Sequence, residues 1–553
     1  MPRVFRVAAL MLVAAAPLFA QRGGGGGGRG GAGGPDPFPV TLPADDERVA
    51  RLKNEAMRLV DSLSTLTQQM VDKVFSFGEL GFQEVETSKY LTGILEKNGF
   101  TIQRNVAGMP TGWTARWGSG KPVIAIGSDI DGIPQASQKP GVGYREPLVP
   151  GAPGHGEGHN SGMPLNVTAA IALRQIMMKE KIPGTIVLWP GVAEEQMAGK
   201  AYFVRSGVFK DADAVLFTHV SSNMGVSWGE SSQSALISAA FDFRGRAAHA
   251  AGSPHQGRSA LDAVMLMDIG WNFRREHLPT SQRSHMVVSD GGDQPNVVPQ
   301  TATAWYYFRE TNTPRVKANF ALGDTIARAA AMMTGTELAN VRILGSGWSA
   351  HFNKPIAEAM GANMSKVPPI QWTEADQQLA RGLQCDLGGQ PRGLGSGQGG
   401  VSGTLAAPTT GGGSDDIGDV SWNVPTVTLR YPANIPGSPG HDWSAAVAMA
   451  TPIAHKGTTA GAKVQAMTMV DLFLKPQILE QAWRYFREVQ TKDVKYEPLM
   501  KETDVPPTFL NEAILAKYRP QMKQFYYDET KHKTYLDQLG IKYPTVRACN
   551  NPG

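Results

Sequence analysis

A series of short apolar runs, each bounded by glycine or proline, constrains the fold of this chain more than any other feature. Such runs predict β-strands, and stretches with helical apolar spacing, such as Val167–Lys179, lie between some of them. Strands that alternate with helices favour an α/β domain built on a mostly parallel sheet. The predicted strands are Val123–Gly127, Thr185–Trp189, Ala214–Phe217 and Thr426–Leu429.

Helices are expected before the first of these strands. The segment from Asp45 to Phe75 has helical apolar spacing and an acidic first turn. A second helix is expected at Glu84–Asn98.

The pattern changes between Ser231 and about Gly347. Two predicted helices and four predicted strands follow one another there, which is typical of a self-contained α+β sandwich inserted into the α/β domain. The expected strands are Ala235–Phe243, Met286–Ser289, Val298–Phe308 and Glu337–Leu344, and the expected helices are Ser259–Glu276 and Pro314–Thr334.

The length of 553 residues indicates two or more hydrophobic cores. We expect a signal peptide at 1–20, a glycine-rich linker at 21–44, a catalytic domain in two parts at 45–230 and 348–495, an inserted dimerisation or lid domain at 231–347, and a C-terminal extension at 496–553. The role of the extension cannot be inferred from its sequence.

The first residues are typical of an export signal. Arg3 and Arg6 precede an apolar run from Val7 to Phe19, and Ala20 is small enough for a cleavage site. A buried helix is the alternative, but the position and the flanking residues favour export. The run is too short for a membrane anchor, and no other segment has membrane-spanning length. We therefore expect a periplasmic or secreted protein.

Charge and cysteine content exclude several classes of function. Removal of Arg3 and Arg6 takes two charges from the formal +4, and the basic residues are spread along the chain, so neither nucleic acid nor an anionic membrane is an expected partner. Cys385 and Cys549 are the only cysteines. They are able to pair in an oxidising compartment, but two cysteines do not make a disulfide framework, and thiol chemistry is not expected.

Acidic residues and histidines follow the predicted strands. Ligands bind at the carboxyl ends of strands in open α/β sheets, so these side chains are expected to meet. Any one of them is compatible with a helix cap, and GHGEGHN (154–160) is by itself compatible with a solvated loop. Together they favour a shared site. The residues concerned are Asp129, Asp131, Glu194, Glu195, His219 and His441, with Glu157 and His159 in GHGEGHN.

The adjacent pair Glu194 and Glu195 indicates a metal. Two neighbouring carboxylates repel each other unless a cation lies between them. Imidazole with carboxylate suits Zn²⁺, Mn²⁺ or a related ion. The GSGWS segment near Gly345 lacks the strand–turn–helix context of a serine nucleophile. Metal-assisted hydrolysis is therefore a better interpretation than hydrolysis by a serine nucleophile.

The chain resembles the dinuclear-metal aminoacylase and carboxypeptidase family of amidohydrolases, over about Glu47 to Lys492. The motifs are highly specific only in combination. They are SDIDGIP, GHGEGHN, AEE, TH, GRAAHAAGSPHQGRSALDA, GGDQPNVVPQTATAWYYFRE, GGGSDDIGDVSWNVPT and GHDW.

The resemblance implies a role for each matching residue. Glu194 matches the family's general base, and Asp131 matches a carboxylate that orients the site. His249 matches a histidine that reaches the partner subunit's site and steadies the oxyanion, which implies a homodimer. Asn296 and Arg309 match residues that hold the substrate's carboxylate. The implied ligands of two divalent ions, Zn²⁺ or Mn²⁺ with Co²⁺ as a further option, are Glu157, His159, Glu195, His219 and His441.

Glu157 departs from the pattern of the most similar subgroup, which commonly has a bridging cysteine at this position. A carboxylate is chemically reasonable because other branches of the family bridge their metals with aspartate. The glycines of GHGEGHN are expected to let the backbone turn so that Glu157 and His159 both face the metals.

The expected function is that of an exported metal-dependent amidohydrolase, a metallopeptidase-like enzyme that cleaves the amide bond of an N-acyl or N-aroyl amino acid. Aminobenzoyl-glutamate is the family's precedent substrate. A dipeptidase or aminoacylase of the same family is the alternative. A binding protein that kept the fold without the chemistry is a third, less favoured interpretation.

Overall fold

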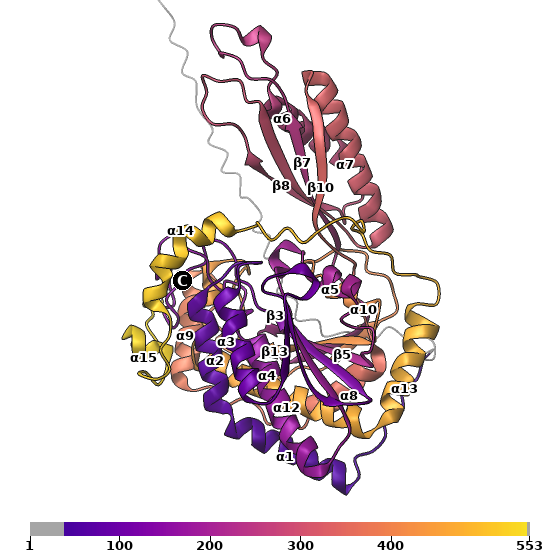
Figure 1. Cartoon of the computed structure of the whole chain (residues 1–553). Coiled ribbons are helices and arrows are strands. Elements are labelled where there is room, and N and C mark those ends of the chain that lie inside the picture. Colours follow the sequence, from indigo (N-terminus) through magenta and orange to yellow (C-terminus); the bar gives the residue numbers. More distant parts are fainter. Residues whose placement is uncertain (1–37, 550–553) are drawn as a thin grey trace, which may run out of the picture. The chain divides into compact units, whose positions relative to one another are not determined.

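The computed structural model describes residues 38–549, and from Val40 onward the chain forms one compact unit. The predicted signal peptide at 1–20 and residues 21–37 of the predicted linker lie outside the described residues. Two sheets organise the unit, a nine-stranded one and a four-stranded one (Figure 1). The predicted fold class, a mostly parallel α/β sheet with a separate α+β domain, is confirmed.

The centre of the large sheet is parallel and carries the strands that the apolar runs predict. Strands β4, β3, β5 and β13 lie side by side in that order, each parallel to its neighbour. The outer strands pair mainly in the antiparallel sense. The strands are β1 Thr101–Arg104, β2 Trp113–Ser119, β3 Val123–Asp129, β4 Gly184–Gly191, β5 Ala214–Ser221, β6 Gly225–Glu230, β11 His351–Phe352, β12 Val401–Thr404 and β13 Thr426–Pro432.

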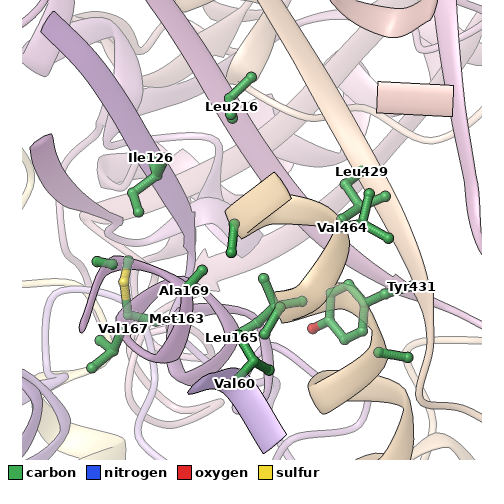
Figure 2. Close-up of a cluster of buried hydrophobic side chains, with 14 of the residues drawn as sticks. Val60, Ile126, Met163, Leu165, Val167, Ala169, Leu216, Leu429, Tyr431 and Val464 are labelled. Atoms are coloured by element: carbon green, nitrogen blue, oxygen red, sulfur yellow. The ribbon is translucent and has the colours of Figure 1, made fainter. Parts of the chain in front are cut away.

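Apolar side chains leave the central strands on both faces, which explains the uninterrupted apolar runs. On one face Ile126, Leu216 and Leu429 belong to the core that Leu165 and Val464 of two helices also enter (Figure 2). These helices are α4 (Gly162–Glu180) and α12 (Pro452–Leu474), and both are apolar around most of their circumference because they are buried.

The opposite face of the same strands forms a second core. Ala125 and Val215 point into it, next to Trp189, which stacks on Phe217 with ring centroids 5.4 Å apart. Helix α5 (Lys200–Ser206) and helix α10 (Ile417–Ser421) cover this side. The central sheet is thus fixed between two apolar layers, and its carboxyl edge is held in place for the site.

The smaller sheet is antiparallel, with the strand order β10-β7-β9-β8. Its two helices pack on it through a third core that includes Phe241, Trp271 and Phe308. The elements are β7 Ala235–Arg244, α6 Ala260–Arg275, β8 Arg283–Asp290, β9 Thr301–Glu310, α7 Thr313–Thr334 and β10 Glu337–Gly347.

The predicted helical stretch at Asp45–Phe75 is divided into two helices, α1 (Glu47–Ser62) and α2 (Ser64–Phe77). Leu63 leaves the helical conformation, with φ −94° and ψ 4°, and its N–H bonds to the carbonyls of Leu59 and Val60. The predicted helix at Glu84–Asn98 is α3 (Val85–Lys97).

The remaining helices lie mostly in the second half of the chain, and the C-terminal segment is attached covalently. Cys385 and Cys549, whose pairing the sequence left open, form a disulfide with a Cα–Cα distance of 5.6 Å. No helix within residues 38–549 is long and apolar enough to cross a membrane. The remaining helices are α8 Lys354–Met364, α9 Glu374–Asp386, α11 Trp443–Ala446, α13 Pro476–Tyr485, α14 Glu512–Met522 and α15 Tyr535–Leu539.

Candidate metal centre

The carboxyl edge of the central strands gathers the residues that the sequence singles out. Asp129 ends β3, the turn with Glu194 and Glu195 follows β4, and His219 lies near the end of β5. His441 lies between β13 and α11. The GHGEGHN loop runs between β3 and α4, so all of these segments reach one edge of the sheet.

The GHGEGHN loop depends on its third glycine, Gly158. Gly158 has φ +117°, and a Cβ there would lie 2.5 Å from Met449 Sδ, so this position tolerates only glycine. Glu157 and His159 on either side both turn toward the cluster. His155 turns away, with its Nε2 3.1 Å from the Val74 carbonyl oxygen, and it is buried. The first histidine of the motif therefore supports the loop.

Glu157 lies at the centre of three imidazoles. Its Oε2 is 3.2 Å from His441 Nε2 and 3.3 Å from His159 Nε2. Its Oε1 is 3.5 Å from His219 Nε2. Because the two oxygens of one carboxylate face different imidazoles, Glu157 is placed where a bridging ligand would be.

The two glutamates after β4 sit on a tight turn. Ala193 and Met197, on either side of it, have φ +52° and +55°, a left-handed conformation that is unusual for such residues. Glu195 Oε2 lies 3.6 Å from His441 Nε2, and Glu194 Oε2 lies 4.0 Å from His159 Nε2. Both carboxylates thus face the imidazole cluster.

Asp131 holds this arrangement from behind. Its Oδ1 lies 3.4 Å and its carbonyl oxygen 3.2 Å from His159 Nδ1, and its Oδ2 accepts the N–H of Glu195 at 3.1 Å. A proton on His159 Nδ1 leaves Nε2 with a free lone pair toward Glu157. Asp131 is therefore positioned to fix the tautomer of one ligand and the backbone of another.

His219 lies between Glu157 and the guanidinium of Arg430. Its Nδ1 lies 3.0 Å from the Val220 carbonyl oxygen and 2.6 Å from Arg430 Nη1. A guanidinium only donates, so Nδ1 accepts the Arg430 N–H, while Nε2 faces Glu157. Burial and the Arg430 guanidinium lower the pKa of His219 to about 3, so the ring is neutral, as a metal ligand must be.

Several atoms of the cluster fit a divalent cation. His159 Nε2 and Glu195 Oε1 are buried and have no hydrogen-bond partner within residues 38–549. Burial by itself would lower the pKa of His159, but Glu157 and Asp131 raise it well above its ordinary value. The carboxylates thus favour a positive charge at the position of His159. Glu157, His159, Glu194 and Glu195 each offer a ligand atom within 4.8 Å of the others.

The structure also shows a buried charged cluster that the sequence analysis did not identify. Lys200 Nζ lies 2.6 Å from Asp129 Oδ1, 3.2 Å from Asp415 Oδ1 and 2.5 Å from Asp416 Oδ1, and all four side chains are buried. Burial, followed by the carboxylates of Asp129 and Asp415, raises the pKa of Glu194 well above its ordinary value. In the sequence, only the adjacent aspartates Asp415 and Asp416 in the GGGSDD motif could have indicated this cluster.

Arg309 and Tyr307 bring β9 of the smaller sheet to the same region. The Tyr307 hydroxyl donates to the Glu195 carbonyl oxygen at 3.1 Å. Arg309 donates from Nε to Ser414 Oγ at 3.1 Å, and its guanidinium carbon lies 5.0 Å from the centre of the Tyr307 ring. Arg309 forms no ion pair within residues 38–549. Its charge is available to an anion. Sequence reasoning missed Tyr307.

His249 and Asn296 are brought together, but away from Arg309. The Ala250 N–H donates to the Asn296 carbonyl oxygen at 3.0 Å, at the end of the β7–β9 pair opposite Arg309. A strand rises about 3.4 Å per residue, so the ten residues of β9 separate the two ends by about 30 Å. Both residues are exposed. His249 and Asn296 therefore do not join this chain's own cluster.

Comparison with known proteins finds relatives that are peptidases or amide hydrolases. A family model, M20 peptidase dimerisation domain, matches residues 231–331. Over 480 residues the chain is 32% identical to one of the subunits of p-aminobenzoyl-glutamate hydrolase from Escherichia coli (strain K12), covering 82% of this chain and 99% of the relative. The Xaa-Arg dipeptidase of Mus musculus is 25% identical over 444 residues, covering 79% of this chain and 92% of that protein.

A solved structure shares the fold. The crystal structure of a protein from methicillin resistant Staphylococcus aureus aligns with 76% of this chain and 100% of its own, with a TM-score of 0.53 and 18% sequence identity. At this level of identity the likeness concerns the fold alone.

Proposed function

Since the chain belongs to the M20 peptidase family of metal-dependent amidohydrolases, which act on amide bonds, we propose that it cleaves the amide of an N-acyl or N-aroyl amino acid. The observation that carries this proposal is the convergence of three imidazoles and two glutamates around Glu157. The name of the Escherichia coli relative supports aminobenzoyl-glutamate as the model substrate.

The proposed ligands hold two divalent ions, either Zn²⁺ or Mn²⁺, with Co²⁺ as a further option. Oxygen and imidazole donors without sulfur suit all three metals. The ligands are Glu157, His159, Glu195, His219 and His441, and neighbouring donor atoms among them lie 3.2–3.6 Å apart. When bound, such ions lower the pKa of water and polarise a carbonyl oxygen.

Glu194 is the proposed general base. It takes a proton from the attacking water while the water oxygen bonds to the amide carbonyl carbon. The carbon–nitrogen bond then breaks, and Glu194 returns the proton to the departing amine. Glu194 lies next to the ligand Glu195 in the chain, with its Oε2 4.0 Å from His159 Nε2, so both carboxylates serve the same reacting centre.

Arg309 is the proposed anchor of the substrate's carboxylate in the same chain. A guanidinium binds a carboxylate with two parallel hydrogen bonds, and the charge of Arg309 is not used by any ion pair within residues 38–549. Its link to Ser414 and its position over Tyr307 hold it beside the turn of Glu194 and Glu195.

His249 and Asn296 are proposed to complete the site of a partner subunit. His249 Nδ1 accepts the N–H groups of Ala251 and Gly252 at 3.2 Å and 3.1 Å, which places the ring proton on the exposed Nε2. That N–H is able to donate to the developing oxyanion. Because both residues lie about 30 Å along the sheet from Arg309, this role requires a homodimer.

The smaller sheet has features that suit pairing with a second copy. Strand β8 is at the edge of the sheet, and Val287 and Val288 on it are exposed. On α6, Met265, Ile269 and Phe273 are four residues apart and exposed, and Phe273 is 73% exposed. An apolar helix stripe beside an open strand edge is favourable to association.

Export is also part of the proposal. The apolar segment after Arg3 and Arg6 supports it, and so does the disulfide between Cys385 and Cys549, because disulfides persist in oxidising compartments. Export would be measured by the N-terminus of protein recovered outside the cytoplasm. An N-terminus near Gln21 is expected, whereas uncleaved cytoplasmic protein would contradict the proposal.

The substrate is tested with purified protein that has been reconstituted with Zn²⁺ or Mn²⁺. The panel contains p-aminobenzoyl-glutamate, N-acyl amino acids and dipeptides, including Xaa-Arg. The highest kcat/KM is expected for an N-acyl or N-aroyl amino acid. A preference for dipeptides favours the dipeptidase alternative, and no turnover of any amide by metal-loaded protein contradicts the proposed function.

A further inference from the structure

The segment 79–84, between α2 and α3, lies between the C-terminal extension and the loops of the metal centre. On its inner side the Gly132 N–H donates to the Glu79 carbonyl oxygen at 2.7 Å, and the Ala193 N–H donates to Glu84 Oε1 at 2.9 Å. Gly132 follows Asp131 directly, and Ala193 precedes Glu194. This segment therefore contacts both catalytic loops.

Gly81 brings the segment against the glutamate turn without space between them. A Cβ at Gly81 would lie 2.0 Å from Gln196 Oε1 and 2.7 Å from Ala193 Cα. A displacement of this backbone therefore displaces the turn that carries Glu194 and Glu195.

On its outer side the segment is bound by the extension. Asn511 Nδ2 donates to the Gly81 carbonyl oxygen at 3.0 Å and to Gln196 Oε1 at 3.2 Å. Arg519 Nη2 donates to Glu79 Oε1 at 2.9 Å and to the Gln83 carbonyl oxygen at 2.6 Å. Asn511 thus joins the extension directly to the residue that follows Glu195.

The extension is fixed at both ends, so it is able to transmit a constraint. At its start the Tyr496 hydroxyl donates to Asp419 Oδ1 at 2.6 Å. Near its end the Tyr543 hydroxyl donates to Asp376 Oδ1 at 2.7 Å, and Cys549 is bonded to Cys385.

We propose that the C-terminal extension positions the turn that carries Glu194 and Glu195, with Asn511 as the positioning residue that acts on it directly. The turn has left-handed Ala193 and Met197 at its two ends, a conformation that persists only where the surroundings hold it. The inference rests on the proposed function for the catalytic role of Glu194. It assigns a function to a segment whose sequence reveals none.

The most direct variant is Asn511→Gly. Asn511 has φ +65°, which glycine adopts without strain, so the change removes the side-chain hydrogen bonds and keeps the backbone. The matched control is Gln521→Ala, an exposed residue of α14 whose Nε2 bonds only to the Lys517 carbonyl oxygen in the same helix. We expect kcat of Asn511→Gly to fall about tenfold with KM within about twofold and with unchanged metal content, because small misplacements of catalytic groups cost that much or more.

A second pair of variants tests the outer contact. Arg519→Met removes both hydrogen bonds to the 79–84 segment, whereas Arg519→Lys keeps a cation next to Glu79. We expect kcat to fall in Arg519→Met and to recover at least partly in Arg519→Lys. If Arg519 had only a structural role, both variants would have a lower melting temperature, but kcat would not fall in Arg519→Met and recover in Arg519→Lys.

Hydrogen exchange supplies a readout that does not require activity. The amides of 191–199 are expected to exchange faster in Asn511→Gly than in wild type or Gln521→Ala. If the wild type hydrolyses no amide, the proposed function is wrong. The exchange rates at 191–199 still show whether Asn511 positions the turn. Unchanged exchange at 191–199, or unchanged kcat in an active Asn511→Gly protein, would overturn the inference.

Discussion

Glu194 and Glu195 are neighbours in the chain, yet their carboxylates have different surroundings. Glu195 Oε2 faces His441 Nε2 at 3.6 Å, whereas Glu194 shares a cluster with Asp415 and Asp416. One carboxylate is thus placed as a ligand, and the other lies between the ligands and the buried charges around Lys200. This difference separates the two roles at the scale of single residues.

We predict that Glu194→Gln keeps its metal and loses hydrolysis, because the amide is unable to accept a proton. Loss of a general base commonly lowers kcat by about 10²–10⁴-fold. Elemental analysis and kcat of Glu194→Gln and of the control Glu195→Gln measure both effects. Metal loss in Glu194→Gln, with full metal in Glu195→Gln, would show that the roles are exchanged.

Glu157 carries a prediction of its own. If it bridges two ions, Glu157→Gln is expected to lower the metal content from about two ions per chain toward one or none, since a neutral amide does not balance their charge. Glu157→Cys is expected to retain metal, because a thiolate is able to bridge. Elemental analysis under reducing conditions decides this. Glu157→Gln with wild-type metal affinity would mean that Glu157 is not a ligand.

At the scale of elements, the central strands are predictable because both of their faces are buried, so their apolar runs are continuous. Their ends are less predictable. The predicted strand Val123–Gly127 continues to Asp129, because Ser128 bonds to the Thr218 carbonyl oxygen and Asp129 to Lys200. Buried polar residues with distant partners look like loop residues in sequence.

Some residues of the site could be predicted from the sequence, and others could not. Most ligand candidates lie at or after the carboxyl ends of neighbouring strands, so the strand order brings them to one edge, and the GHGEGHN loop adds Glu157 and His159. Lys200 gave no such signal, since a lysine is normally exposed and its partners Asp415 and Asp416 are more than 200 residues away in the chain. Asn511 is likewise identifiable only from its contact with Gln196.

The β7–β9 pair carries a prediction about assembly. His249→Ala is expected to keep metal and fold but lose activity, and a mixture with Glu194→Gln is expected to regain some turnover. Mixed dimers contain one site with both an intact Glu194 and a partner His249. Activity of the mixture is measured after subunit exchange is demonstrated. No recovery would indicate that His249 acts within its own chain or has no catalytic role.

At the scale of the whole molecule, the fold holds one cluster of ligands from segments spread between Asp131 and His441. Two apolar layers fix the central sheet, and the C-terminal extension binds the 79–84 segment beside the catalytic loops and is tied down by a disulfide. The cluster is therefore preorganised, so metal binding is expected to need little rearrangement of the backbone.

The most direct measurement is a metal titration of the whole chain. Protein stripped of metal by chelation is titrated with Zn²⁺ or Mn²⁺, and hydrolysis of p-aminobenzoyl-glutamate, or of the best amide in the panel, is followed against ions bound per chain. We predict no hydrolysis without metal and a maximum near two ions per chain. Full hydrolysis by metal-free protein would contradict the account.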